Sequence, residues 1–231
     1  MKELKIWHIG DTHTFHELLE IPKDIDLVIF SGDCSNPRDP YKNELEVRNF
    51  IEWFGALPIK HKVFVAGNHD GSIEKGLVKK IDFTNSTIHY LENTHITIEG
   101  VKIFGSPYTP RFGDWAFMKQ RNKMDAMWRN VIDEDTNIVV VHGPPKGMLD
   151  LSYDRDNRLE HCGDRSLWNK VVKINPELML FGHIHNNKDI VNAGTRTAPD
   201  LKTTFSNGSV VKDREFGMLS SNGNILNIKL N

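Results

Sequence analysis

Seven short runs of apolar residues, rich in β-branched and aromatic side chains, recur along the sequence, and each is bounded by Gly, Pro, Asp or Asn. This pattern is typical of β-strands. Several runs are apolar at consecutive positions instead of at every second one, which indicates strands that are buried on both faces. The predicted strands are Leu4–Ile9, Leu27–Phe30, Val63–Ala66, Ile96–Ile98, Val101–Phe104, Ile138–Val141 and Leu178–Phe181.

Three segments between these runs have helical patterns. In the first segment, Asn43 followed by Glu46 offers an N-terminal cap. Apolar residues then recur at i, i+3, i+4 and i+7, which places them on one face of a helix. These residues are Val47, Phe50, Ile51 and Phe54.

A second helix is predicted between Asp164, which offers a cap, and Pro176, which lies beyond its end. Its apolar face comprises Leu167, Val171 and Ile174. A third helix is predicted over Met118–Ile132.

Near residue 222, Asn222-Gly223 lies between the apolar segments Met218-Leu219 and Ile225–Ile228, which is a strong signal for a hairpin. Strands that alternate with helices, followed by an antiparallel piece, indicate a layered α/β protein with one mixed sheet or a pair of sheets. The 231 residues contain no internal repeat and no Pro/Gly/Ser-rich linker, so we expect a single domain over residues 1–231.

The composition excludes several classes of function. A net charge of −2 argues against a protein whose whole surface binds nucleic acid or membrane, although a local basic groove stays open. No apolar run reaches the ~18 residues that span a bilayer, and residues 1–7 lack the apolar core of a signal peptide. The two cysteines, Cys34 and Cys162, form no C-x-x-C motif and are expected to be free thiols in a reducing cytoplasm.

Polar residues that can bind metal ions follow five of the predicted strands. In open α/β sheets, ligand sites lie at the carboxyl ends of the strands, and glycines beside these residues allow tight turns and close approach of the backbone. We therefore expect the five segments to converge on one site. They are Gly10–His13, Ser31–Asp33, Gly67–Asp70, His142–Pro144 and Gly182–His185.

The donor atoms in these segments are nitrogen and oxygen, without sulfur. Such donors favour divalent Mn, Fe, Co, Ni or Zn over Cu(I) or iron–sulfur clusters. Two cations ~3.5–4 Å apart need an anion between them, and a carboxylate together with a bridging hydroxide can supply it. A water bound to such ions titrates near neutral pH, and the ions also hold the phosphoryl oxygens.

In this order and spacing, the five segments resemble the motifs of the calcineurin-like metallophosphoesterase superfamily. The motifs are Asp11-x-His13, Gly32-Asp33, Gly67-Asn68-His69-Asp70, His142-Gly143 and Gly182-His183-x-His185. The resemblance implies a four-layer α/β/β/α sandwich, in which two mixed sheets are flanked by helices. A closer likeness, to the branch of the mammalian metallophosphoesterase-domain proteins and their bacterial relatives, rests on Gly105–Phe112, Trp115–Phe117, His142–Pro145 and Phe181–His185.

The resemblance also implies a role for each motif residue. Two divalent ions are expected, with Mn as the first choice and Fe, Zn, Co or Ni as alternatives. One ion would be held by Asp11, His13 and His185, and the other by Asn68, His142 and His183, with Asp33 bridging the two. His69 would face the leaving group as a general acid or charge stabiliser. Asp70 would orient His69 or the loop.

Other residues are candidates for substrate binding. Arg111 is expected either to pair with a substrate phosphate or to be a solvated surface residue, and Asn207 either to line the site or to form a turn. The aromatic segment 106–117 either stacks a nucleobase or packs a long loop onto the sheet, and packing is favoured. The pair His161-Cys162 is expected to be structural. We expect His8, His16, His61, His89 and His95 to be core or surface histidines.

Together these observations predict a dinuclear metal-dependent phosphodiesterase that hydrolyses a small phosphodiester by attack of a metal-bridging hydroxide. A cyclic nucleotide is one candidate substrate. The alternatives are a nuclease or phosphomonoesterase of the same superfamily, or a catalytically silent binding or scaffold protein. A nuclease would need a basic groove or a capping domain, which the sequence does not indicate, so nucleic acid is not an expected partner. The sequence leaves the oligomeric state open.

Overall fold

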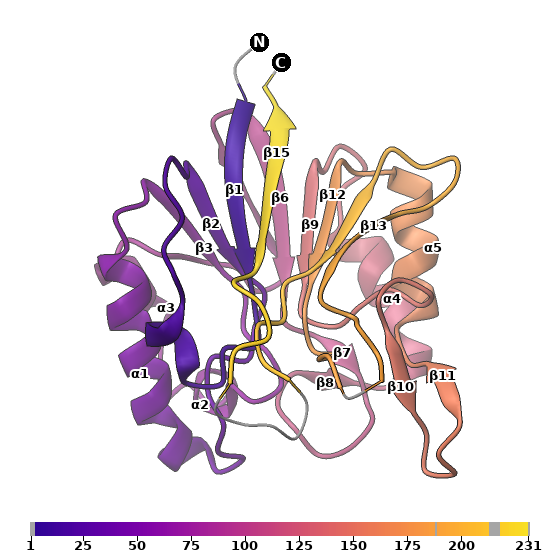
Figure 1. The fold of residues 1–231 in the computed structure, drawn as a ribbon, viewed down its shortest axis with the longest axis horizontal. Coiled ribbons are helices and arrows are strands. Elements are labelled where there is room, and N and C mark those ends of the chain that lie inside the picture. The colour runs from indigo at the N-terminus through magenta and orange to yellow at the C-terminus, as the bar shows by residue number, and fades with distance from the viewer. Residues whose placement is uncertain (1–2, 188, 213–217, 231) are drawn as a thin grey trace.

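A computed structural model describes residues 3–187, 189–212 and 218–230. Its core consists of two β-sheets that face each other (Figure 1). The first sheet has the order β15 (Asn224–Lys229), β1 (Glu3–Ile9), β2 (Leu27–Phe30), β3 (His61–Phe64), β4 (His89–Tyr90). The second has the order β13 (Gly194–Thr197), β14 (Thr204–Asn207), β12 (Leu178–Phe181), β9 (Ile138–Val141), β6 (Val101–Ser106), β5 (Thr94–Ile98).

Both faces of each central strand are buried, which explains the apolar residues at consecutive positions. In β2, Ile29 faces the other sheet whereas Phe30 faces the helical layer, because successive side chains point to opposite faces. The space between the sheets is filled from both sides by apolar residues that include Ile6, Ile29, Val63, Ile103, Val140 and Leu180.

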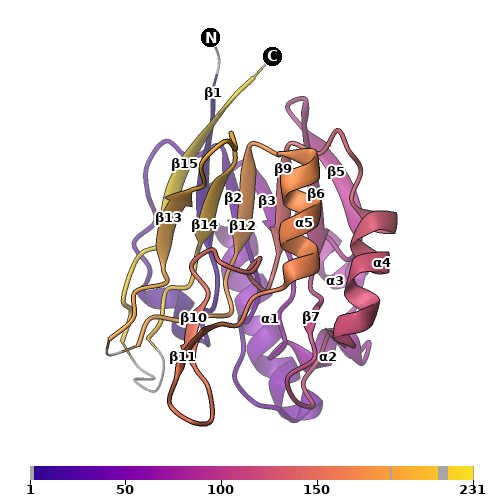
Figure 2. The same cartoon turned by 90° about the vertical axis from the view of Figure 1, so that its right-hand side faces the viewer.

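Helices cover the two outer faces. Helices α1 (Pro40–Ala56) and α3 (Lys80–Asn85) pack on the first sheet, and α4 (Arg121–Val131) and α5 (Arg165–Ile174) pack on the second (Figures 1 and 2). The four layers confirm the predicted α/β/β/α sandwich. The parallel strands of both sheets end at the lower edge in Figure 1.

Short elements surround this edge. They include the 3₁₀ helix η1 (Phe15–Leu18), α2 (Gly71–Glu74) and the two-residue strands β7 (Thr109–Pro110) and β8 (Met118–Lys119). Strands β10 (Leu151–Tyr153) and β11 (Leu159–His161) form a hairpin that projects beyond the sheets (Figures 1 and 2). Leu151 and Ser152 of β10 line a cavity at this edge.

The predicted start of the first helix is wrong. The helix begins at Pro40, and the side chain of Asp39 caps it by accepting a hydrogen bond from the backbone N–H of Tyr41. Proline suits the first turn because its fixed φ matches the helix and its missing N–H is not needed there. Asn43 instead lies buried inside the helix, where its side chain contacts Ser35 and Ser72.

The other two helices were predicted more closely. Asp164 caps α5 as expected, by accepting from the N–H of Ser166, and Asn175 ends the helix in the left-handed conformation. Helix α4, however, begins at Arg121, because Met118 and Lys119 form β8 and pair with β7.

The hairpin predicted at Asn222-Gly223 is also wrong. β15 pairs antiparallel with β1, with Ile225 opposite Trp7, while Leu219 forms only an isolated bridge to Val211. Every second residue of β15 is buried, so its apolar side chains complete the core between the sheets. Pairing with the distant strand β1 and burial of apolar side chains therefore outweigh the local preference of Asn222-Gly223 for a hairpin turn.

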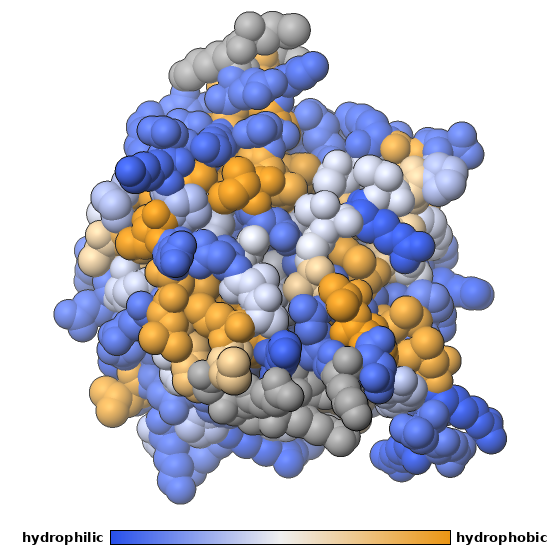
Figure 3. Space-filling view, viewed as in Figure 1, coloured by the Kyte–Doolittle hydropathy of each residue, from blue (hydrophilic) through white to orange (hydrophobic). Residues whose placement is uncertain are grey.

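On the face shown in Figure 3, hydrophobic residues form separate patches among hydrophilic ones. Within the described residues, the helices are too short or too polar to cross a membrane.

Candidate metal centre

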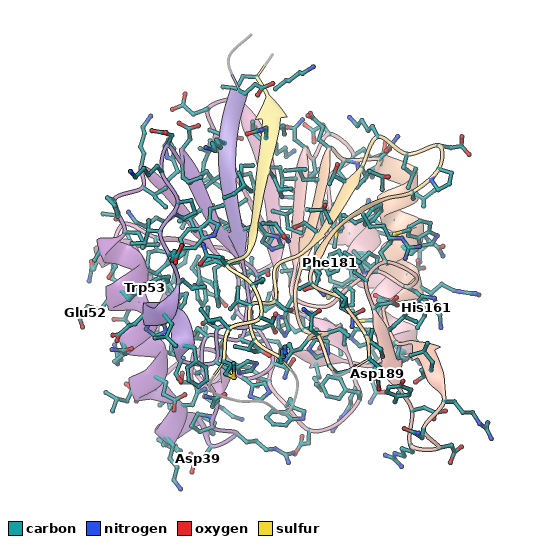
Figure 4. The ribbon with its side chains drawn as sticks, viewed as in Figure 1. Asp39, Glu52, Trp53, His161, Phe181 and Asp189 are labelled. Carbon is teal, nitrogen blue, oxygen red and sulfur yellow. The ribbon has the colours of Figure 1, made fainter. Side chains whose placement is uncertain are left out.

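The five polar segments meet at the edge where the parallel strands end. Strands β1, β2 and β3 run parallel in one sheet, and β9 and β12 run parallel in the other, so the loops that follow them emerge on the same side. Phe181, labelled in Figure 4, is the last residue of β12 and directly precedes one of these loops. The structure thereby brings together side chains that lie up to 174 residues apart in sequence.

One cluster comprises Asp11, His13 and His185, whose potential ligand atoms all lie within 4.8 Å of one another. His185 Nε2 is 3.1 Å from Asp11 Oδ1 and 3.3 Å from His13 Nε2. Asp11 and His13 are buried, so these donor atoms are largely withdrawn from water. The cluster corresponds to the first predicted ligand set.

The second cluster comprises Asp33, His142 and His183, again with ligand atoms within 4.8 Å. His142 Nε2 lies 3.3 Å from Asp33 Oδ2 and 3.0 Å from Asn68 Oδ1, so the amide of Asn68 belongs to the same group. The other oxygen of Asp33 accepts a 2.7 Å hydrogen bond from the backbone N–H of His69.

Two backbone carbonyls fix the orientation of the imidazole rings. His13 Nδ1 lies 3.1 Å from the carbonyl oxygen of Ser35, and His142 Nδ1 lies 2.8 Å from that of Ser31. A carbonyl can only accept, so each Nδ1 carries a hydrogen, and each Nε2 is the ring nitrogen that is left to bind a metal ion. Metal-binding histidines typically have this second hydrogen bond. The donor set and its orientation therefore fit divalent metal ions.

Four of the cluster residues have a left-handed backbone. The φ angles are 51° for Asp11, 43° for His13, 61° for Asp33 and 71° for His183. This conformation costs about 1–2 kcal/mol for a residue with a Cβ atom, and such strain concentrates at functional sites. The sharp turns at the strand ends thus aim the donor side chains inward at a cost in stability.

Two glycines make room for the carboxylates. A Cβ atom at Gly67 would overlap the carboxylate of Asp33, and one at Gly182 would overlap that of Asp11. These positions need glycine because the side chains of the two clusters occupy the space.

The charges of the clusters follow from their mutual proximity. Burial raises the pKa of Asp11, but His185 beside it outweighs this effect and the pKa falls to about 2. Burial lowers the pKa of His183 to about 3 and that of His13 to about 4, so both rings are neutral at pH 7. Burial also disfavours the charged form of His142, but the carboxylate of Asp33 raises its pKa to about 9. Without metal, His142 therefore keeps a proton that metal binding must displace.

His69 lies at the edge of the clusters with its ring facing a cavity of about 240 Å³, which we call the site cavity. Its Nδ1 lies 2.9 Å from the carbonyl oxygen of Asn36, so Nδ1 carries the hydrogen and Nε2 is left for another partner. The ring packs against Trp115 at 4.4 Å between centroids and edge-on against His13 at 4.8 Å.

Asp70 holds the loops together. Its buried carboxylate accepts hydrogen bonds from the backbone N–H groups of Asp33, Cys34 and Gly67 and from the hydroxyl of Ser35. It is not among the residues that line the site cavity. Of the two predicted roles, the structure supports the orientation of the loop.

The two predicted substrate-binding residues lie elsewhere. The guanidinium of Arg111 is half exposed, donates to the carbonyl of Gly113 and pairs with Asp114, and Arg111 does not line the site cavity. Asn207 is buried, and its side-chain amide donates to the carbonyls of Ile184 and Leu149. Arg111 is thus a surface residue, and Asn207 supports the loop that carries His183 and His185.

The aromatic residues of segment 106–117 divide between the core and the site cavity. Tyr108 and Phe117 pack against each other and against the core, at 5.8 Å between ring centroids. Phe112 and Trp115 instead line the site cavity.

The remaining histidines lie outside the two clusters. His8 and His16 are buried, and His161 lies at the edge of the molecule, where it pairs with Asp150 (Figure 4). The sequence analysis missed Ser209, whose hydroxyl donates to Asp11. Ser209 ends the segment Asn207-Gly208-Ser209, in which the sequence indicated only Asn207 as a candidate. It is the serine that contacts the cluster.

The fold and the paired clusters define a class of protein: an α/β sandwich with donor groups for divalent metal ions. Residues 4–187 match the family described as calcineurin-like phosphoesterase, and the chain therefore belongs to this family. Membership in this family implies divalent metal ions.

Curated relatives support this assignment. Human metallophosphoesterase domain-containing protein 1 is 30% identical over 227 residues, which cover 87% of this chain and 64% of the relative. The chain thus spans 64% of the length of that protein. A UPF0046 protein of Caenorhabditis elegans is 32% identical over 207 residues, covering 84% of this chain and 68% of the relative.

Among solved structures, phosphopantetheinyl hydrolase from Mycobacterium tuberculosis has a TM-score of 0.59 and 13% sequence identity, covering 92% of this chain and 91% of that one. At this identity the likeness concerns the fold.

Proposed function

We propose that this chain is a dinuclear metal-dependent phosphodiesterase that hydrolyses a small phosphodiester. The observation that carries the proposal is the position of Asp33. Its carboxylate belongs to the second cluster through His142, while His13 of the first cluster also lowers its pKa. The backbone N–H of His13 also donates a 3.2 Å hydrogen bond to the carbonyl oxygen of Asp33, so Asp33 lies between the two clusters. We assign Asp11, His13 and His185 to one ion and Asn68, His142 and His183 to the other, with Asp33 shared.

When bound, two divalent ions would lower the pKa of a nearby water and neutralise charge on the phosphoryl oxygens. The oxygen and nitrogen donors are compatible with Mn²⁺, our first choice, and with Fe, Zn, Co or Ni as alternatives. The protein contributes the geometry: burial of Asp11 and Asp33 keeps the carboxylates out of water, and the carbonyls of Ser31 and Ser35 hold the rings.

We assign the proton that the leaving group needs to His69. Its Nδ1 donates to the carbonyl of Asn36, so Nε2 is the ring nitrogen left for the site cavity. In the imidazolium form both ring nitrogens carry a hydrogen, and Nε2 can then give its proton to the leaving oxygen. Trp115 packs on the same ring and excludes water from one side of it.

The lining of the site cavity favours a diester over a monoester. Of the described residues that line it, none is Lys or Arg. A monoester carries about two negative charges near neutral pH, whereas a diester carries one. A site without protein cations therefore suits the less charged substrate, and a cyclic nucleotide stays one candidate.

The experiment is purification with Mn²⁺, followed by assay of bis-p-nitrophenyl phosphate with the native protein and with Asp33→Ala. Turnover that needs metal and is lost in Asp33→Ala supports the proposal, whereas turnover equal to the buffer blank in both contradicts it. Asp133→Ala, at an exposed position, serves as a control.

A substrate panel tests the finer assignments. We expect 2′,3′- or 3′,5′-cyclic nucleotides and simple diesters to react faster than monoesters. Faster reaction of monoesters would favour a phosphomonoesterase, and cleavage of labelled DNA or RNA would favour a nuclease. Sub-stoichiometric metal after reconstitution would favour a silent scaffold protein. We also propose a cytoplasmic location, which the free thiols of Cys34 and Cys162 support.

A further inference from the structure

A second cavity of about 520 Å³ opens beside the site cavity. We call it the side cavity. It lies between the segment that follows β7 and the β10–β11 hairpin, and its lining includes Pro110, Phe112, Pro144, Tyr153, Cys162 and Ile184. Nothing in the catalytic geometry described above uses this space.

The two cavities share a wall next to the second cluster. Phe112, Ser152, His183 and Ile184 line both of them. The ring of Phe112 lies 5.2 Å from that of His183 between centroids, at an interplanar angle of 47°. A group attached to a phosphoryl centre at the clusters therefore reaches the side cavity by passing Phe112.

The lining of the side cavity suits a planar, largely apolar group. Phe112 and Tyr153 are 53% and 42% exposed, so packing within the chain does not account for these aromatic side chains. The charged residues on the lining are of both signs, Arg121 and Arg155 against Asp154, Glu160 and Asp164. The carboxylate of Asp164 already accepts hydrogen bonds from Trp128 and Ser166, which leaves two charges of each sign that are at least partly exposed. The cavity thus offers aromatic contact without a net preference for an anion or a cation.

The position of His69 indicates which ester group of the substrate lies toward each cavity. His69 and Trp115 line the site cavity but not the side cavity, whereas His183 borders both. A leaving group that takes a proton from His69 lies on the Trp115 side. The other ester group of the same phosphorus then points past Phe112.

From this arrangement we propose that the side cavity binds the ester group that stays on phosphorus, and that this group is a planar aromatic one, a nucleobase or an aryl ring. The inference rests on the proposed function. In the reaction, the oxygen of water bonds to phosphorus, the P–O bond to the leaving group breaks, and the leaving oxygen takes a proton. The product left in the side cavity is the phosphomonoester of the aromatic group.

Three substrates with one leaving group test the proposal: methyl p-nitrophenyl phosphate, phenyl p-nitrophenyl phosphate and thymidine 5′-(p-nitrophenyl phosphate). The native protein should prefer the phenyl or the thymidine ester to the methyl ester. In Phe112→Ala and Tyr153→Ala, the ratio of kcat/KM for the preferred ester to that for the methyl ester should fall about tenfold, as expected for one lost aromatic contact. The preferred ester distinguishes an aryl ring from a nucleoside.

Leu159→Ala is the matched control, because Leu159 lies opposite Tyr153 across the hairpin but does not line the cavity. It should keep the native ratio. Equal rates of all three esters with the native protein, or an unchanged ratio in both cavity variants, would overturn the proposal. A fall of the kcat/KM ratio in Trp115→Ala alone would overturn it too, because the retained group would then lie beside Trp115 in the site cavity.

The proposed function can fail separately from this inference. If no substrate is hydrolysed, the side cavity can still be tested by binding. Calorimetric titration of the metal-loaded protein then gives the affinities for phenylphosphonate and methylphosphonate. Tighter binding of phenylphosphonate that is lost in Phe112→Ala supports the side cavity. Equal binding of the two phosphonates contradicts it.

Discussion

The hydroxyl of Ser209 donates a 2.7 Å hydrogen bond to Oδ2 of Asp11, although 198 residues separate the two in sequence. The contact is buried, and a bridge between Gly10 and Ser209 aligns the two backbones. The other oxygen of Asp11 lies 3.1 Å from His185. Ser209 therefore sets the orientation of a carboxylate in the first cluster.

We expect Ser209→Ala to weaken metal binding about 10- to 100-fold, the usual effect of removing a residue that orients a metal ligand. Titration with Mn²⁺ against a chelating dye measures the affinity. Ser220→Ala is a control from a nearby loop, since its hydroxyl bonds only the carbonyl of Val210 among the contacts described. Equal affinity in Ser209→Ala and the native protein would mean that Asp11 needs no such support.

His69→Ala should keep the metal content but slow the cleavage of esters with poor leaving groups most. The reason is that the substitution removes the proton donor for the leaving oxygen and no atom of either three-residue cluster. The measurement is kcat/KM across a series of aryl esters with increasing leaving-group pKa, together with metal analysis. Equal slowing across the series would contradict the assigned role.

Asp70→Asn should lower the free energy of unfolding by about 3 kcal/mol or more, because a buried carboxylate that joins two loops loses part of its hydrogen bonds. Urea unfolding of the metal-free protein measures the change. Asp133→Asn removes an exposed ion pair with Lys102 and should cost less than about 1 kcal/mol. Similar losses in the two variants would show that Asp70 does not brace the loops.

Both cysteines should resist alkylation in the folded protein. Burial, together with the charge of Asp70, raises the pKa of Cys34 well above its ordinary value, and burial with Asp150 nearby raises that of Cys162 to about 12. At pH 8 only about 10⁻⁴ of Cys162 is then thiolate, the reactive form. With 5,5′-dithiobis(2-nitrobenzoate), we expect slow reaction in buffer and rapid reaction of two thiols in urea. Rapid reaction in buffer would refute this.

The sequence predicted the buried strands because burial on both faces requires apolar residues at consecutive positions, whereas the four-layer sandwich was implied by the resemblance to a known family. Strands such as β2 and β9 need apolar residues at every position, and a short run of this kind between turn residues is typical of a buried strand. The donor segments were predictable for a related reason, since each directly follows one of these strands. Their convergence on one site depends on the strand order, which the structure supplies.

The sequence did not reveal two kinds of feature: the pairing of a segment with a distant strand, and the direction of individual side chains. Asn222-Gly223 has the composition of a hairpin turn, but Leu226 and Ile228 gain more by burial between the sheets. Arg111 and Asn207 have the right chemistry for a substrate site, and only the structure shows Arg111 on a surface turn and Asn207 beneath a loop. Side-chain direction in irregular segments has no periodic signal in sequence.

The buried His8 should make stability depend on pH. It lies between Ser206 and Ser31, and burial lowers its pKa to about 3 although the nearby charge of Asp11 acts in the opposite direction. Between about pH 6.5 and 3 the unfolded chain binds a proton at His8 that the folded protein does not, so its contribution to stability is complete above pH 6.5 and is lost as the pH falls.

Each pH unit below pH 6.5 lowers the free energy of unfolding of the native protein by about 1.4 kcal/mol through His8. Between pH 7 and pH 5, the free energy of unfolding of His8→Gln should therefore fall by about 2 kcal/mol less than that of the native protein. Urea unfolding of the metal-free native protein and of the variant at both pH values gives the two losses. Glutamine keeps a donor and an acceptor for the two serines, so the comparison isolates the titration. His89→Gln, at an exposed position, is the control. If the native protein and His8→Gln lose equal stability on acidification, His8 does not carry this dependence.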